Sequence, residues 1–213
     1  MLFVEVHVKY RALTVAREFG SGGAQVAQSI ANRLGWKLLD DGLIEEIACA
    51  AQVDSKVVSR FDEHVEGWLR RINRQAMRGA AMAGGIELDQ EKCFDEDTMF
   101  DLTRKIMEQA HRAGNCVIVG RGAQFILQSK PDVFHVFVYA PLRVRIDRVR
   151  SRLKPGVSIE GRIREVDEER AHYLKLRFAK DWRNPHFYDL MICSGEEEGH
   201  AARIIEFAME EAK

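Results

Sequence analysis

The chain has 213 residues, of which 46% are hydrophobic and 31% charged, the composition of an ordinary globular domain. Its 32 basic and 33 acidic residues nearly balance, which argues against a general nucleic-acid or membrane-surface binder. Cys49, Cys93, Cys116 and Cys193 lie far apart, which disfavours a zinc site and favours reduced thiols in a cytoplasmic protein. No apolar run reaches the length of about 18 residues that a membrane span needs.

The amino-terminal part of the sequence predicts a strand, a glycine turn and a helix, in that order. Residues 1–19 alternate apolar and polar residues, which is typical of a strand and not of a secretory signal. Within them, 13–16 form the apolar core of a strand that ends at the glycines of 20–23. Residues 24–34 then place apolar side chains on one helical face, and Gly35 ends the helix.

The remaining pattern alternates strands with helices. The predicted elements are, in chain order, strand 36–39, helices 43–51 and 57–83, loop 84–97, helix 100–113, strand 116–119, a short helix to 128, strand 133–139, helices 142–153 and 159–181, strand 189–193 and helix 201–212. This alternation predicts one α/β domain over 1–213, with a parallel sheet covered by helices on both faces. Residues 55–98 are expected to form a helical insertion within it.

The glycine turn is the first segment that could carry chemistry. A glycine turn between a strand and a helix can bind phosphate, because its N–H groups and the positive helix end face the anion. The usual phosphate loop reads G-x-x-x-x-G-K-[ST]. Aligned on Gly22, this chain has Arg17 in place of the first glycine, Gly23 in place of the lysine and Ala24 in place of the hydroxyl residue. A phosphate-binding turn and a plain strand–helix connection both remain open on this motif alone.

The residues around this turn resemble those of the cytidylate kinase-like family. The segment 14–23 is similar to the S-R-E-[FY]-G-S-G-G opening of that family, and 34–40 is similar to its L-G-x-x-x-x-D segment. A turn without lysine is typical of the family, although Ala24 stands where many members carry arginine. The resemblance implies a three-layer α/β/α P-loop kinase fold that uses ATP and Mg²⁺. The nucleotide-binding residues that it implies are Arg17, Gly20, Ser21, Gly22, Gly23 and Ala24.

A second segment extends the resemblance. Residues 117–122 are similar to the strand of cytidylate kinases that ends in E-G-R-D, and Arg121 matches the arginine that holds the monophosphate. Val119 stands where those kinases have glutamate, and Gly122 begins the segment where they have aspartate. An arginine at the carboxyl end of a parallel strand lies on the ligand side of the sheet. Asp40 is expected either near the acceptor nucleotide or as a helix N-cap.

Residues 141–183 form the most basic part of the chain, with thirteen Lys and Arg against seven Asp and Glu. By resemblance this region is the arginine-rich lid, whose cations would neutralise the transferring phosphoryl group. Arg148, Arg152 and Arg170 are the predicted catalytic residues. Most of the other arginines are expected to lie on a solvated helix face, in pairs with acidic residues one turn away.

Two functions follow from these patterns. The first is a nucleotide-dependent phosphotransferase that moves the γ-phosphoryl group of ATP to a small acceptor, such as a nucleoside monophosphate. The second is a non-catalytic nucleotide- or phosphate-binding protein with a degenerate loop. A kinase for a different small acceptor is a further alternative, because the fold does not fix the acceptor. The apolar helices within 57–113 could form either an acceptor pocket or a homodimer interface, and neither nucleic acid nor membrane is an expected partner.

Overall fold

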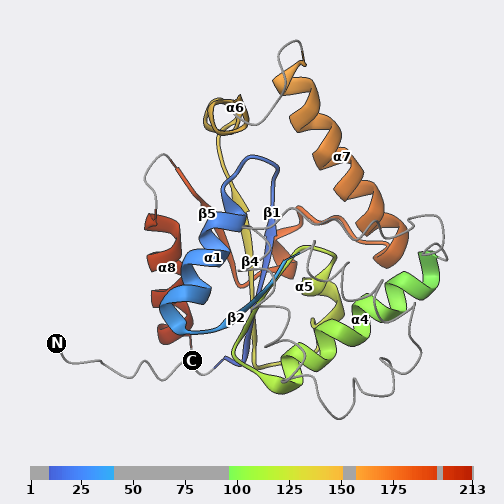
Figure 1. Ribbon diagram of the computed structural model, residues 1–213, viewed down its shortest axis with the longest axis vertical. Helices are drawn as coiled ribbons and strands as arrows, with labels where there is room; N and C mark the ends of the chain where they lie inside the picture. The colour runs from blue at the N-terminus through green and yellow to red at the C-terminus, as the bar shows by residue number, and fades with distance from the viewer. Residues whose placement is uncertain (1–9, 41–95, 151–156, 196–198, 213) are drawn as a thin grey trace, which may run out of the picture. The chain divides into compact units, whose positions relative to one another are not determined.

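The computed structural model describes residues 10–40, 96–150, 157–195 and 199–212 (Figure 1). The chain divides into two units, one made of Met1–Asp41 with Gly114–Lys213 and the other of Gly42–Ala113. In the second unit the structure describes helix α4 (Glu96–Ala113). The predicted helices 43–51 and 57–83, and the predicted insertion 55–98 up to residue 95, lie outside the described residues.

Five parallel strands form the sheet of the first unit. They are β1 (Ala12–Arg17), β2 (Lys37–Leu39), β3 (Cys116–Val119), β4 (Val133–Tyr139) and β5 (Leu190–Cys193). Their order across the sheet is β2-β3-β1-β4-β5, so β1 lies at the centre between β3 and β4. Because all the strands run the same way, their carboxyl ends meet at one edge, where ligands bind in sheets of this kind. The predicted parallel α/β sheet is confirmed.

Helices cover both faces of this sheet, which confirms the three-layer arrangement (Figure 1). The helices of the unit are α1 (Gly23–Leu34), α5 (Ala123–Ile126), α6 (Leu142–Arg150), α7 (Ile159–Phe178) and α8 (His200–Glu211). On one face, Leu13 and Val15 of β1 pack with Ile30 of α1 and Ile205 of α8. On the other face, Phe137 packs with residues of α7 and with segments that follow it. Strand alternation therefore sends successive side chains of β1 into two different cores.

Some element bounds differ from the prediction. Helix α4 begins at Glu96, inside the predicted acidic loop, since acidic side chains are favourable in a first helical turn. Helix α7 ends at Phe178 because Ala179 adopts a left-handed φ of 54° and closes the helix by donating its N–H to Lys175 O. A 3₁₀ turn at Pro185–Phe187 was not predicted. No helix in the described ranges is long and apolar enough to cross a membrane.

Candidate active site

The glycine turn connects the carboxyl end of β1, at Arg17, to the first residue of α1, at Gly23. Gly20 and Gly22 both have a φ of 79°, a left-handed conformation that glycine adopts without the usual steric cost. The first N–H groups of α1 have no carbonyl partner within the helix, and they carry its positive dipole end. The turn therefore has the local structure of an anion-binding loop.

Buried charges fix the start of the turn. Arg145 of α6 lies with its Nη1 3.1 Å from Glu18 Oε2 and donates a hydrogen bond from its Nε to Phe19 O at 2.7 Å. The same guanidinium forms an ion pair with Asp167 of α7. Asp167 in turn accepts the backbone N–H of Phe19 at 2.8 Å. Helices α6 and α7 thus both hold the backbone where the strand turns toward the glycines.

A second arginine fixes the middle of the turn. Arg148 Nη1 donates to Ser21 O at 2.8 Å and to Ser194 Oγ at 2.8 Å, and its Nη2 donates to Gly195 O. Ser194, which follows β5, also donates its hydroxyl to Ser21 O. Arg148 was predicted as a catalytic lid residue. Its guanidinium instead binds main-chain and side-chain oxygens of the protein, and its catalytic role stays a prediction.

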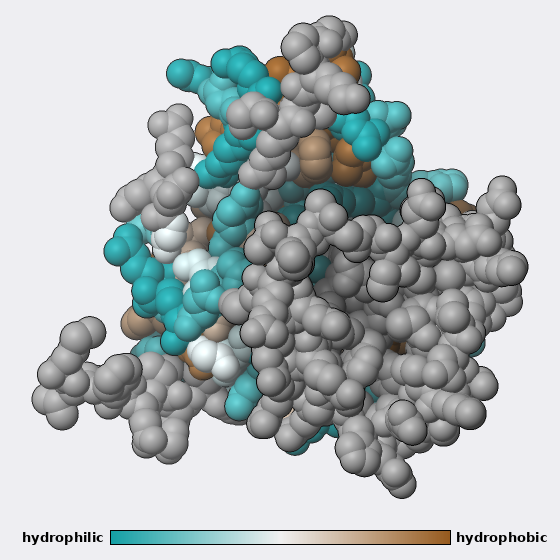
Figure 2. Space-filling model, in the orientation of Figure 1, coloured by the Kyte–Doolittle hydropathy of each residue, from teal (hydrophilic) through white to brown (hydrophobic). Residues whose placement is uncertain are grey.

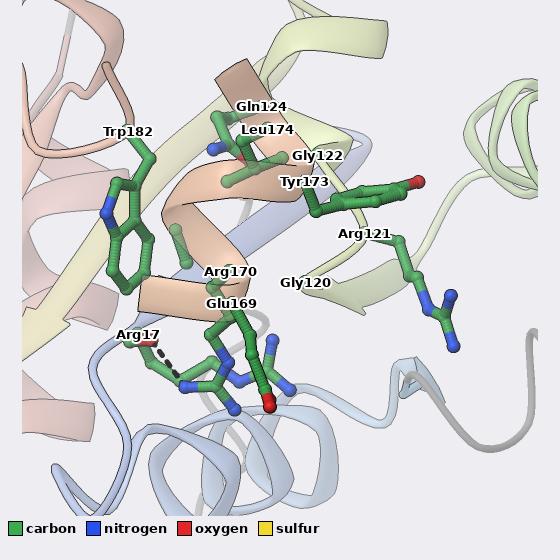
Figure 3. A pocket seen from close by; sticks show the side chains of 11 residues that line it. Arg17, Gly120, Arg121, Gly122, Gln124, Glu169, Arg170, Tyr173, Leu174 and Trp182 are labelled. Atoms are coloured by element: carbon green, nitrogen blue, oxygen red, sulfur yellow. Dashed lines mark hydrogen bonds between the residues drawn. The ribbon is translucent and has the colours of Figure 1, made fainter. Parts of the chain in front are cut away.

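A pocket of about 320 Å³ opens at the carboxyl edge of the sheet, beside the turn (Figure 3). Its lining comes from the ends of β1 and β3, from α5 and from α7 with the segment that follows. The lining residues are Ala16, Arg17, Gly120, Arg121, Gly122, Gln124, Glu169, Arg170, Tyr173, Leu174 and Trp182. Three of the predicted site residues, Arg17, Arg121 and Arg170, are therefore brought to one cavity from three different parts of the fold.

The three arginines are held in different ways. Arg170 Nη1 donates to Arg17 O at 3.0 Å, and its guanidinium carbon lies 5.9 Å from the ring centroid of Phe19. Arg121 has a left-handed φ of 51°, which is uncommon for a residue with a side chain. Figure 3 shows Arg17 and Arg170 together on one side of the pocket, whereas the side chain of Arg121 extends toward the other side. The positive charge therefore reaches the cavity from two directions.

The rest of the pocket lining includes the carboxylate of Glu169 and aromatic and amide side chains. Trp182 is 3% exposed and packs edge-on against Phe137, with 5.4 Å between ring centroids. Gln124 Nε2 donates to the hydroxyl of Tyr188 at 3.2 Å, and that hydroxyl donates to Trp182 O at 2.5 Å. Burial raises the pKa of Tyr188, so its hydroxyl stays protonated and can keep this donor role. These lining residues were not predicted from the sequence, because aromatic and amide side chains at such positions also suit ordinary packing.

The outer face of α7 carries charges of a different kind. Arg162 lies 2.6 Å from Glu165, and Arg164 lies 3.2 Å from Glu160, both at the spacing of one helical turn. Figure 2 shows hydrophilic residues on the surface in the region of this helix, with hydrophobic residues exposed among them. These arginines therefore form the expected solvated face, while Arg170 of the same helix lines the pocket.

Asp40 and Ala24, two further predicted residues, do not line the cavity. Asp40 follows β2, is exposed, and is not among the residues that line the pocket. Arg152 lies outside the described residues. Ala24 is exposed in the first turn of α1 and offers no side-chain oxygen to a cation. Within the described ranges, no group of three or more His, Cys, Asp or Glu side chains is placed to hold a metal ion.

The residues present fit a phosphate chain better than a metal bound by the protein alone. The turn and the helix end supply N–H donors, and Arg17 and Arg170 supply charge beside them. Magnesium commonly keeps several waters and is bound largely through phosphate oxygens, so a site with few carboxylates does not conflict with its use.

Comparisons with known proteins agree with this fold. The family model described as the cytidylate kinase-like family matches residues 12–196. No curated protein matches the chain. Among solved structures, an uncharacterized protein from Eubacterium ventriosum ATCC 27560 is 20% identical with a TM-score of 0.63, over 92% of this chain and 97% of that one. Shikimate kinase from Bacteroides thetaiotaomicron is 17% identical with a TM-score of 0.50, over 94% of this chain and 96% of that one. These likenesses show the P-loop kinase fold.

Proposed function

The chain belongs to the cytidylate kinase-like family, and on that premise we propose that it transfers the γ-phosphoryl group of ATP to a small anionic acceptor. The observation that carries the proposal is the convergence of Arg17, Arg121 and Arg170 on one pocket beside the glycine turn. Phosphoryl transfer needs little covalent chemistry from the protein, because catalysis comes from positioning and from stabilising charge on the phosphoryl oxygens. The three arginines come from different parts of the fold, line one cavity and would supply that stabilisation.

On the donor side, we propose that the turn Gly20–Ala24 binds the phosphates of ATP. The hydrogen bonds of Arg145 and Arg148 hold the turn in place before a ligand arrives, which reduces the entropy lost on binding. Mg²⁺ would bridge the phosphate oxygens and neutralise their charge. Because Ala24 has no hydroxyl, the ion would be held through nucleotide oxygens and water.

On the acceptor side, we propose that Arg121 binds the anionic group of the acceptor. Its planar fork suits the oxygens of a phosphate or a carboxylate. The aromatic surfaces of Tyr173 and Trp182 would contact the uncharged part of the molecule. A nucleoside monophosphate is our first choice, and Asp40 is proposed to contact it or to cap the segment that follows β2.

Among the predicted lid residues, Arg170 is the one that this arrangement favours as catalytic. It lines the pocket and lies against both Arg17 and Phe19 of the turn. Arg148 is favoured as a residue that positions the turn, since its guanidinium binds Ser21 and Gly195. Arg152 is kept as a proposed catalytic residue on the resemblance alone.

A non-catalytic binding protein is the second proposal, and two residues favour it. Val119 is 1% exposed within the apolar core, so this position offers no carboxylate to the acceptor. Ala24 likewise offers no oxygen to Mg²⁺. A protein with these residues could bind a nucleotide and transfer nothing.

The test uses the full chain with ATP and Mg²⁺, and a panel of acceptors that includes each common nucleoside monophosphate and, for the alternative acceptor, shikimate. ADP formation is measured beside ATP binding by calorimetry. We expect turnover with one acceptor. Arg121→Ala should lower the rate of ADP formation by at least about tenfold, which is the effect of removing one charge-assisted hydrogen bond. Arg203→Ala, which removes an exposed arginine of α8, is the matched control.

Each outcome decides between the proposals. Turnover that depends on Arg121 supports the kinase. ATP binding without turnover on any acceptor supports the non-catalytic protein. If ATP does not bind, the glycine turn is not a phosphate site and both proposals are wrong.

A further inference from the structure

Two positions of the turn carry each other's usual residue type. In the ordinary phosphate loop the first position is glycine and the seventh is lysine. In this chain the first position is Arg17 and the seventh is Gly23. The cation and the glycine are therefore exchanged between the end of the strand and the start of the helix.

The structure gives the steric reason for this exchange. A Cβ atom added at Gly23 would lie 2.5 Å from Arg17 Cβ and 3.0 Å from Arg17 Cγ. These atoms are the stem of the arginine, next to the backbone, so they cannot move away as the end of a flexible side chain could. The next neighbour, Val138 Cβ, would lie at 3.4 Å, an ordinary van der Waals contact. The stem of Arg17 is therefore what excludes a side chain from position 23.

The same stem fills the space in which a lysine of the helix would begin. The Arg17 side chain lines the same pocket as Arg121 and Arg170, and Figure 3 shows it running along the pocket's edge beside Arg170. The backbone of Arg17 is fixed from α7, because its carbonyl accepts a hydrogen bond from Arg170 at 3.0 Å. The backbone and the stem of Arg17 are therefore held by neighbours on both sides.

We infer that Arg17 binds the phosphate chain of the nucleotide in place of the loop lysine, acting from the end of β1 and not from α1. This inference rests on the proposed function, because it needs a triphosphate at the turn. Arginine donates through a planar fork, whereas lysine is a point charge, so the exchange also changes how the phosphate oxygens are contacted. The alternative is that Arg17 only packs against Gly23 and supports α7.

A set of substitutions separates these two roles. Arg17→Met keeps most of the stem and removes the charge, and Arg17→Gly removes both. Arg17→Gly combined with Gly23→Lys, called the restored-loop variant below, returns glycine and lysine to their ordinary positions. Arg17→Ala combined with Gly23→Lys, called the crowded-loop variant, is its matched control. The Cβ that alanine keeps is the atom 2.5 Å from a side chain added at position 23.

The measurement is the Kd for ATP by calorimetry, with and without Mg²⁺, and circular dichroism checks that each variant is folded. We expect Arg17→Met and Arg17→Gly to weaken binding by at least about tenfold, as expected for a charged hydrogen bond to phosphate. The restored-loop variant should recover to within about threefold of the wild-type affinity, a non-additive result for residues in contact. The crowded-loop variant should still bind ATP weakly. Arg164→Ala, on the solvated face of α7, should bind ATP with the affinity of the wild type.

The inference is overturned if the wild type binds ATP and Arg17→Met binds it equally well. It is also overturned if the restored-loop variant binds no better than Arg17→Gly while remaining folded. In either case the proposed function survives, because the wild type still binds. If the wild type itself binds no ATP, the proposed function is wrong and the inference is wrong with it.

Discussion

The guanidinium of Arg145 and the carboxylate of Asp167 form an ion pair beneath the glycine turn, and both groups are buried. Each partner also binds the main chain of Phe19, the arginine at its carbonyl and the aspartate at its N–H. The pair therefore joins α6 and α7 through the backbone of the turn. A change in either helix reaches the turn directly.

Replacing Asp167 by asparagine should destabilise the fold. The substitution leaves the buried Arg145 with Glu18 as its remaining acidic partner, so we expect a loss of about 1–3 kcal/mol in the free energy of unfolding, less than for a buried charge left fully unpaired. Glu168→Gln is the control, because Glu168 is exposed on the same helix. Urea unfolding monitored by fluorescence measures both variants. Equal stability of the two would contradict a structural role for the pair.

Arg148→Met tests whether this arginine positions the turn or acts in catalysis. Its loss leaves buried oxygens of Ser21 and Ser194 without this donor, so we expect the free energy of unfolding to fall by about 1–3 kcal/mol, with weaker ATP binding. Arg150→Ala removes an arginine of the same helix that is 66% exposed, and it should change the free energy of unfolding and the ATP affinity little. A fall in kcat with unchanged stability and unchanged ATP affinity would instead identify Arg148 as catalytic.

Gly122→Ala should lower the stability of the fold, because the ring of Phe178 lies against this residue. A Cβ at Gly122 would lie 2.4 Å from Phe178 Cε2, and the residue has a φ of 77°. Gly35 has a similar φ of 65° but has nothing within 4 Å, so Gly35→Ala isolates the backbone strain. We expect about 1 kcal/mol of destabilisation for Gly35→Ala and about 1–3 kcal/mol more for Gly122→Ala. Similar losses in the two variants, measured by urea unfolding, would show that Phe178 moves aside freely.

Stability should fall in mild acid because of His135. Burial lowers the pKa of this histidine, against the opposing effect of Asp189, and its Nδ1 lies 2.7 Å from Thr14 Oγ1. The unfolded chain then binds a proton at higher pH than the folded chain does. The stabilisation is present above the unfolded pKa of about 6.5 and is lost as the pH falls below it, by at most about 1.4 kcal/mol per pH unit.

Unfolding in urea at about pH 7.5 and about pH 5.5 measures this effect, and His135→Gln is the comparison because it cannot titrate. The wild type should lose more stability between the two pH values than the variant loses. An equal loss would mean that other groups carry the pH dependence.

The central strands were predictable because a buried parallel strand is a continuous apolar run. The segments Cys116–Val119 and Val133–Tyr139 were placed with their observed bounds for this reason. Gly20 and Gly22 were predicted as site residues from the glycine turn between a strand and a helix and from the family resemblance, and Arg121 was predicted from the resemblance. Their binding roles stay predictions.

The buried residues that hold the glycine turn were not predictable in the same way. Arg145 and Asp167 lie in segments rich in charge, where a solvated face is the ordinary expectation. What buries them is contact with the turn, more than a hundred residues away in sequence. One signal was present, since Arg145 and Arg148 share a helical face with the buried Val149. The pocket residues Tyr173 and Trp182 had no such signal, because their role depends on where α7 lies.

The close approach of Arg17 to position 23 also has an evolutionary consequence. A change from this loop to the ordinary one requires three substitutions, at positions 17, 23 and 24. At the first two positions, Gly23→Lys alone crowds two stems into one space, and Arg17→Gly alone removes the cation that we propose binds phosphate. On the inference above, an exchange of these two residues by single steps would pass through a form that binds phosphate less well. Searches that define phosphate loops by a lysine will pass over chains of this kind. A pattern that pairs an arginine with a glycine six residues later would find them.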